Sequence, residues 1–188
     1  MTTLIAGLVL FLGIHLLPAF TTFKGSLTAR WGERRYKGLF SLVSFAGLAL
    51  IIAGYAMAQR GAQLFPPQPA AIAIAPYAVT VAFILFAAAN MPGHLRQILK
   101  HPMLIGLLIW STVHLLANGD LRGTVLFGSF FVYAIVDLVS AIRRHAVKSF
   151  EPVLRTDVIA VVAGIVVALI FMTLHRVLFG VRVVPFGI

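Results

Sequence analysis

Six apolar runs, most of them long enough to cross a lipid bilayer, set the main constraint on how this chain can fold. A transmembrane helix needs about 20 predominantly apolar residues. The runs cover approximately residues 3–20, 38–58, 70–89, 103–118, 121–142 and 157–179. We therefore expect an all-α fold, a polytopic transmembrane bundle of about six helices.

The overall composition supports a membrane protein with a single domain. Hydrophobic residues make up 61% of the 188 residues and charged residues only 11%, whereas soluble domains carry about 25% charged residues. The connections between the runs are short, so one integral membrane domain over residues 1–188 is expected. The run from Leu4 to Phe20 has no basic segment before it and no small-residue cleavage pattern after it, and we interpret it as a span rather than a signal peptide. The absence of cysteine excludes disulfides, thiolate haem ligation and cysteine-based zinc or iron–sulfur sites.

Turn-forming residues separate the runs, and small residues occur within them. The sequence Asn118-Gly119-Asp120 predicts a tight turn between the fourth and fifth spans. Glycines such as Gly47, Gly54 and Gly164 would allow helix backbones to approach closely, although small residues are common in membrane helices.

The distribution of positive charge predicts the orientation of the chain. The net charge is +10, but its placement argues against a nucleic-acid partner and for the positive-inside rule of membrane topology. Of the fifteen basic residues, eleven lie in three alternate connections and four lie at the other ends of the spans. The eleven are Lys24, Arg30, Arg34, Arg35, Lys37, Arg96, Lys100, Arg143, Arg144, Lys148 and Arg155. The four are Arg60, Arg122, Arg176 and Arg182. Both termini are therefore expected outside the cytoplasm, and the basic connections are expected inside, in contact with the lipid bilayer.

Three histidines lie within the apolar runs, where an ionisable side chain indicates a functional site. They are His15, His114 and His175, and imidazole is a favoured ligand of haem iron and other transition metals. His15 is expected in the inner half of its span and the other two in the outer half. Two axial ligand pairs for a haem remain open, either His15 with His114 or His114 with His175. The similar expected depth of His114 and His175 in the membrane favours the second pair.

Polar residues near these histidines are further candidates for a cofactor site. Asp137 is expected at the depth of His15, where it could accept the second ring N–H of that histidine or instead pair with Arg143 or Arg144. Around His114, Trp110 at i−4 and Asn118 at i+4 share its helix face.

Boundary residues leave further alternatives open. His101 could be interfacial or meet the polar edge of a cofactor, and Arg176 could receive a haem propionate or extend to lipid headgroups. His94 and His145 are expected to be solvated loop residues.

The segment HPMLIGLLIWSTVHLLANGD from His101 to Asp120, followed by LRGTVLFGSFFVYAIVDLVS, resembles the NnrU family of bacterial membrane proteins. The resemblance extends to Gly13-Ile14-His15-Leu16, to Thr173-Leu174-His175 and to the ending Pro185-Phe186-Gly187. It implies a bacterial membrane protein associated with nitrite and nitric oxide respiration (denitrification). With the orientation expected from the charges, this gives an inner-membrane protein with periplasmic termini.

The NnrU family is also similar to zeta-carotene isomerase, a membrane haem b enzyme that rearranges a cis double bond. This similarity implies haem b as cofactor, with the isomerase's ligand histidines falling on His15 and His114, while His101 and His175 match other motif histidines. It leaves open whether the protein is an enzyme, namely a cis–trans isomerase of a carotenoid-like lipid. The other possibility is a haem-containing sensor, carrier or assembly factor for respiratory nitrogen-oxide enzymes.

A shorter resemblance gives an alternative. Lys100-His101-Pro102 with Gly106 looks like the Arg-His-Pro-x-x-x-Gly element of membrane S-adenosylmethionine-dependent methyltransferases acting on isoprenylcysteine or phospholipid. Those enzymes use acidic residues near the C-terminus, and this chain has no Asp or Glu after Asp157.

Overall fold

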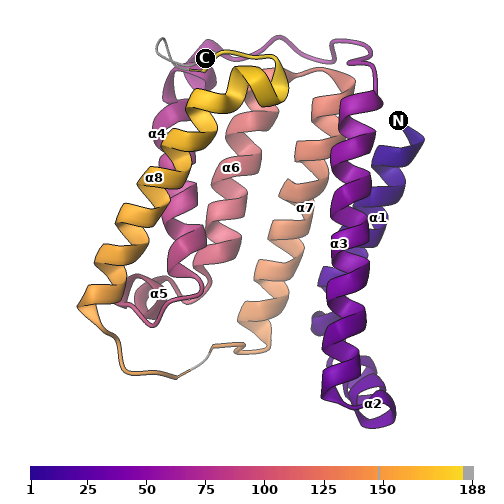
Figure 1. Ribbon diagram of the computed structural model, residues 1–188, viewed down its shortest axis with the longest axis vertical. Helices are drawn as coiled ribbons and strands as arrows, with labels where there is room; N and C mark the ends of the chain where they lie inside the picture. The colour runs from indigo at the N-terminus through magenta and orange to yellow at the C-terminus, as the bar shows by residue number, and fades with distance from the viewer. Residues whose placement is uncertain (148, 184–188) are drawn as a thin grey trace.

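Six apolar helices form the body of the protein (Figure 1), in a computed structural model that describes residues 1–147 and 149–183. They are α1 (Thr2–Leu16), α3 (Glu33–Met57), α4 (Pro69–Ala88), α6 (Pro102–Asn118), α7 (Leu121–Arg143) and α8 (Leu154–Phe179). Five of them are long and apolar enough to cross a membrane, while α6 is apolar but has 17 residues. The expected all-α bundle is confirmed.

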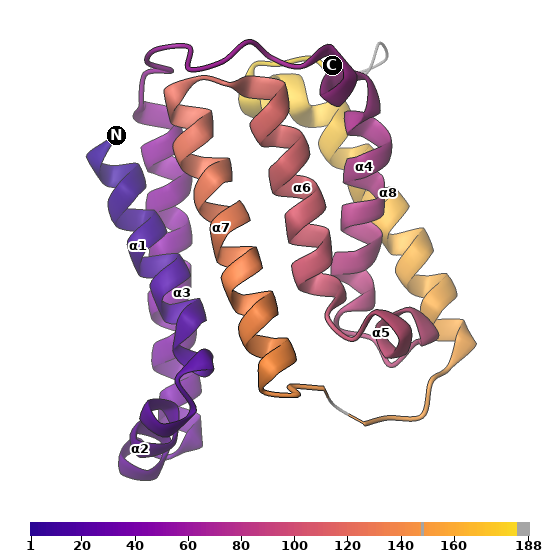
Figure 2. The same ribbon diagram turned by 180° about the vertical axis from the view of Figure 1, so that it is seen from behind.

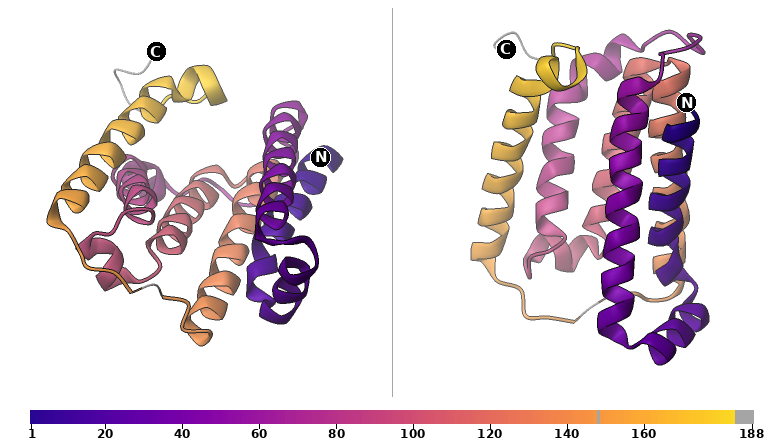
Figure 3. Two further views of the ribbon diagram at one scale, coloured as in Figure 1. Left: turned by 60° about the horizontal axis from the view of Figure 1, so that its bottom comes forward. Right: turned by 45° about the vertical axis from the view of Figure 1, so that its right-hand side comes forward.

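The helices pack in an order that differs from their order along the chain. The closest neighbours are α1 with α3, α6 with α7, and α4 with both α6 and α8, whereas α1 and α7 touch more sparsely. The resulting succession is α3, α1, α7, α6, α4, α8, with α3 and α8 at its two ends (Figure 2; Figure 3). The N-terminal pair α1 and α3 is therefore joined to the other four helices mainly through α7.

Two short helices lie at the end of the bundle that carries the basic connections. The 3-10 turn η1 (Leu17–Ala19) leads into α2 (Thr21–Trp31), and α5 (His94–Leu99) precedes α6. Both appear at the same end in Figure 1. The sequence patterns had indicated loops here, because a hydropathy pattern follows the apolar part of a helix and does not detect polar helical turns. For the same reason α3 begins at Glu33, before the expected start at residue 38.

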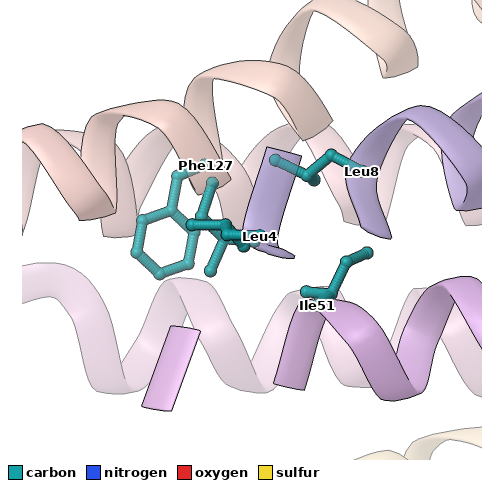
Figure 4. Close-up of a cluster of buried hydrophobic side chains, with 5 residues drawn as sticks. Leu4, Leu8, Ile51 and Phe127 are labelled. Carbon is teal, nitrogen blue, oxygen red and sulfur yellow. The ribbon is translucent and has the colours of Figure 1, made fainter. Parts of the chain in front are cut away.

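Backbone contact at glycines holds α1 against α3. A Cβ atom at Gly47 would lie 2.7 Å from the backbone nitrogen of Phe11, and one at Gly7 would lie 2.6 Å from that of Ile51. Leu4, Leu8 and Ile51 fill the adjoining space together with Leu126 and Phe127 of α7 (Figure 4). The expected close approach at glycines is confirmed here, and also at Gly164, which packs on the backbone of Ile84 between α8 and α4.

A tight turn joins α6 to α7, as the sequence predicted. Gly119 adopts a left-handed conformation with φ of 70°, which glycine tolerates because it has no Cβ. The Asp120 carboxylate then caps α7 by accepting from the Gly123 N–H at 2.9 Å. Arg122 donates to the carbonyls of Tyr55 and Ala58 at 3.0 and 2.9 Å, so the end of α3 is fixed to the start of α7.

Two parts of the sequence predictions lie outside the described residues. These are Lys148, one of the basic residues expected inside, and the Pro185-Phe186-Gly187 ending.

Candidate functional site

The three histidines within the apolar runs share one hydrogen-bonding arrangement. Nδ1 of His15 lies 2.6 Å from the Phe11 carbonyl, Nδ1 of His114 lies 2.8 Å from the Trp110 carbonyl, and Nδ1 of His175 lies 2.9 Å from the Val181 carbonyl. A carbonyl oxygen only accepts, so each Nδ1 carries the hydrogen and donates it. In the neutral ring the Nε2 lone pair is then free, which is the tautomer and second contact typical of metal-ligating histidines.

A cavity of about 390 Å³ opens where α1, α6 and α7 reach the basic end of the bundle. We call it the inner cavity. Its volume falls within the roughly 300–1,000 Å³ usual for small-molecule sites. Aromatic rings from Phe40 and Phe150 line it, and its polar lining consists of His15, Arg96, Lys100, His101, Tyr133, Asp137 and Arg144. Two imidazoles thus share one cavity with three permanent cations and a single carboxylate.

Asp137 pairs within its own helix and its extension, not with His15. Its carboxylate accepts from the Tyr133 hydroxyl at 3.2 Å and lies 3.7 Å from the Arg144 guanidinium. The sequence left His15 and the boundary arginines open as partners of Asp137, and in the structure the partner is Arg144. His15 and Asp137 nevertheless line the same cavity.

The connection before α6 brings His101 and two cations to the inner cavity. Arg96 of α5 lies over the Phe150 ring at 5.1 Å from its centroid. Lys100 has a positive φ of 61°, which turns the chain sharply between α5 and α6. His101 is the residue that precedes the first turn of α6, and Pro102 occupies that first turn, as the sequence predicted.

His114 lies far along α6 from the inner cavity, within an aromatic cluster. It comes thirteen positions after His101 in the sequence, which corresponds to about 20 Å along a helix axis. The Trp110 and Phe127 rings lie 4.9 Å from its ring, and the Asn118 amide donates to its carbonyl at 2.6 Å. The expected face of Trp110, His114 and Asn118 is confirmed, but His15 and His114 are at different depths.

Aromatic rings occupy the path between these two histidines. Phe11 lies 4.2 Å from His15 and 6.0 Å from Phe130, measured between ring centroids. Phe130 in turn lies 5.7 Å from Trp110, which contacts His114. The structure therefore does not bring His15 and His114 to one point.

His175 and Arg176 lie near the outer end of α8. The His175 ring packs on Phe179 at 4.8 Å, and Arg176 is exposed. Neither residue lines the inner cavity.

One pair of polar residues escaped the sequence analysis. His94 is exposed, as expected, but it is also bound to Asp157 in the first turn of α8. The Asp157 carboxylate accepts from His94 Nδ1 at 2.9 Å, from the His94 backbone N–H at 2.8 Å and from the Leu95 N–H at 3.0 Å. We call this the Asp157 clasp. The clasp caps α5 and fixes this short helix to α8. The sequence signal that could have revealed it is the lone carboxylate of Asp157 at the start of an apolar span. His145 is an exposed loop residue, as expected.

Metal-ligating side chains do not cluster in the described part of the chain. Within residues 1–147 and 149–183, no group of three or more His, Asp or Glu side chains could hold a metal ion. A porphyrin supplies four nitrogens to its iron, so one or two histidines complete the coordination. The inner cavity offers two histidines for this purpose.

Comparison with known proteins gave one match. The family model described as "NnrU protein" matches residues 3–183 of the chain. No curated protein and no solved structure matches it.

Proposed function

Because this chain belongs to the NnrU family, we propose that it is a membrane protein that binds haem b in the inner cavity. The observation that carries the proposal is that His15, with Nε2 free, and His101 line one cavity together with three cations. Haem b carries two propionates, which need cationic partners at the edge of their site.

The lining residues divide by chemistry into those that would hold the iron and those that would hold the porphyrin. His15 and His101 supply the imidazoles. Arg96, Lys100 and Arg144 are the cations available to the propionates, and an arginine can bind a carboxylate with two parallel hydrogen bonds. The Phe40 and Phe150 rings offer apolar contact for the macrocycle.

This ligand pair differs from the pair implied by the resemblance to zeta-carotene isomerase. That resemblance favours His15 with His114, and depth in the sequence favoured His114 with His175. We propose His101 in place of His114, because His101 shares the inner cavity with His15 whereas His114 lies about 13 residues further along the chain.

The physiological role we propose is haem-dependent and lies in the bacterial inner membrane, with both termini periplasmic. Haem b supplies one-electron chemistry and reversible binding of small ligands at iron. The protein binds the cofactor among apolar helices, which admit lipid-soluble molecules such as nitric oxide or a carotenoid-like polyene from the bilayer. The role is support of nitrite and nitric oxide respiration, or cis–trans isomerisation of such a polyene.

The methyltransferase alternative has weaker support, because helix packing accounts for its short motif. Pro102 starts α6, and a Cβ at Gly106 would lie 2.9 Å from the Ala82 carbonyl oxygen of α4. The Pro-to-Gly spacing is therefore explained by the start of a helix and its contact with a neighbour.

An absorbance spectrum of the purified protein tests haem binding. We expect a Soret band and a b-type pyridine haemochrome in preparations from haem-sufficient cells. His15→Ala and His101→Ala should lose haem or change its spin state, while His114→Ala and the exposed control His145→Ala should keep the spectrum. A colourless wild-type protein would refute haem binding, and loss of haem in His114→Ala but not in His101→Ala would refute the proposed ligand pair.

Two assays on reduced, haem-loaded protein separate the proposed roles. Conversion of zeta-carotene isomers that depends on His15 and His101 would establish an isomerase. Reversible binding of nitric oxide without any conversion would support the respiratory role.

A further inference from the structure

A second cavity lies outside the proposed haem site, at the corner where α2 meets α3. Its volume is about 500 Å³. It is lined by small, polar and charged residues, namely Lys24, Gly25, Thr28, Ala29, Glu33, Tyr36 and Lys37. None of these residues lines the inner cavity. We call it the corner pocket.

The charges of the corner pocket favour an anionic group. Lys24 and Lys37 supply ammonium groups, and the one carboxylate, Glu33, lies 2.8 Å from Lys37 in an exposed ion pair. The surrounding segment from residue 21 to residue 38 contains five basic residues and one acidic residue. An anion in the pocket therefore meets a net positive field.

Tyr36 also lines the corner pocket, and its hydroxyl is buried. The Tyr36 residue is only 8% exposed, and its hydroxyl has no hydrogen-bond partner among the described residues. This hydroxyl has almost no accessible surface, so it lies behind the pocket wall, and a ligand meets only the rest of the Tyr36 side chain.

Exposed aromatic side chains lie at the same corner and favour a position at the boundary between membrane and water. Phe20, Phe23 and Trp31 project from α2 or its start and are 65%, 53% and 40% exposed. Aromatic side chains are enriched at the boundary between membrane and water. The corner also lies at the basic end of the bundle (Figure 3). The most abundant anions at such a boundary are the phosphates of lipid headgroups.

We propose that the corner pocket binds the phosphate-bearing headgroup of an anionic phospholipid. Lys24 and Lys37 pair with the phosphate. Glu33 opposes binding and competes for Lys37. This lipid site is independent of the haem and of the role proposed above.

The first test measures how much phosphatidylglycerol stays bound to detergent-purified protein, by native mass spectrometry against phosphatidylcholine. A lysine near an anionic membrane surface contributes about fivefold in affinity. Lys24→Gln should lower the retained phosphatidylglycerol about fivefold, whereas Glu33→Gln should raise it. The same direction of change in both variants, or equal retention of the two lipids by the wild type, would overturn the proposal.

The second test blocks the pocket without changing its charge. A Cβ at Gly25, which lines the pocket, meets no atom within 4 Å, and the same is true of Gly38, which does not line it. Gly25→Leu should abolish retention of phosphatidylglycerol, and the control Gly38→Leu should leave it unchanged. Loss in both variants, or in neither, would contradict a defined pocket. Displacement of the lipid by millimolar inorganic phosphate would identify free phosphate as the ligand and overturn the assignment to a headgroup.

Discussion

The contact between α1 and α3 predicts that a glycine-to-alanine substitution in α3 lowers or raises stability according to which glycine is changed. A Cβ added at Gly54 would lie 2.6 Å from the Leu4 Cα and 2.8 Å from the Thr3 carbonyl carbon. Carbon atoms in contact are about 3.5–4.0 Å apart, so α1 would have to move away by roughly 1 Å. Because the obstructing atoms are backbone, no side-chain rotation relieves the contact. Gly54→Ala should therefore separate the two helices.

The magnitude follows from two opposing effects. Overpacking of a tight contact costs about 1–3 kcal/mol, and replacing a mid-helix glycine by alanine returns up to about 1 kcal/mol. We expect Gly54→Ala to lower the free energy of unfolding by about 1–2 kcal/mol. On the scaling for proteins of 150–250 residues, this corresponds to a fall in Tm of roughly 2–8 °C.

Gly38 provides the matched control within the same helix. A Cβ at Gly38 meets nothing within 4 Å. The only effect of Gly38→Ala should be the higher helix propensity of alanine, which raises Tm slightly. Thermal unfolding of both variants in one detergent, followed by far-UV circular dichroism, measures the two shifts. An unchanged or higher Tm for Gly54→Ala would refute the close contact of α1 with α3.

Three further predictions concern the ends of the bundle. The excess of basic residues at the inner end predicts that alkaline phosphatase fused to the C-terminus is active. An inactive phosphatase, together with fluorescence of a green fluorescent protein fused at the same point, would show the opposite orientation. Asp120→Ala should destabilise the protein by about 1 kcal/mol, seen as a lower Tm, because it removes the acceptor for the Gly123 N–H. Asp157→Asn should weaken the Asp157 clasp and speed hydrogen exchange of the His94 and Leu95 amides. Amides in α7 should keep their protection. Equal exchange rates of the His94 and Leu95 amides in variant and wild type would argue against the clasp.

Local sequence patterns were sufficient for the six apolar helices and for the turn between α6 and α7. Hydropathy located all six apolar helices, and Asn118-Gly119-Asp120 predicted the turn between α6 and α7, because both signals arise within a few residues of one another. The spacing of Trp110, His114 and Asn118 placed them on one face for the same reason. The short helices α2 and α5 were missed, since a polar helix leaves no apolar run.

Neighbours across the bundle depended on the tertiary structure. The sequence placed His15 and Asp137 at similar depth, but only the packing showed that Asp137 pairs with Arg144 and that His15 shares a cavity with His101. Hydropathy reports how each residue meets lipid or water, and it carries no information on which helix stands beside which. The composition and spacing of this chain thus determined a helical membrane protein with histidines in its spans. The succession of helices in space decided which side chains line one cavity, because that succession follows from contacts between segments far apart in the sequence.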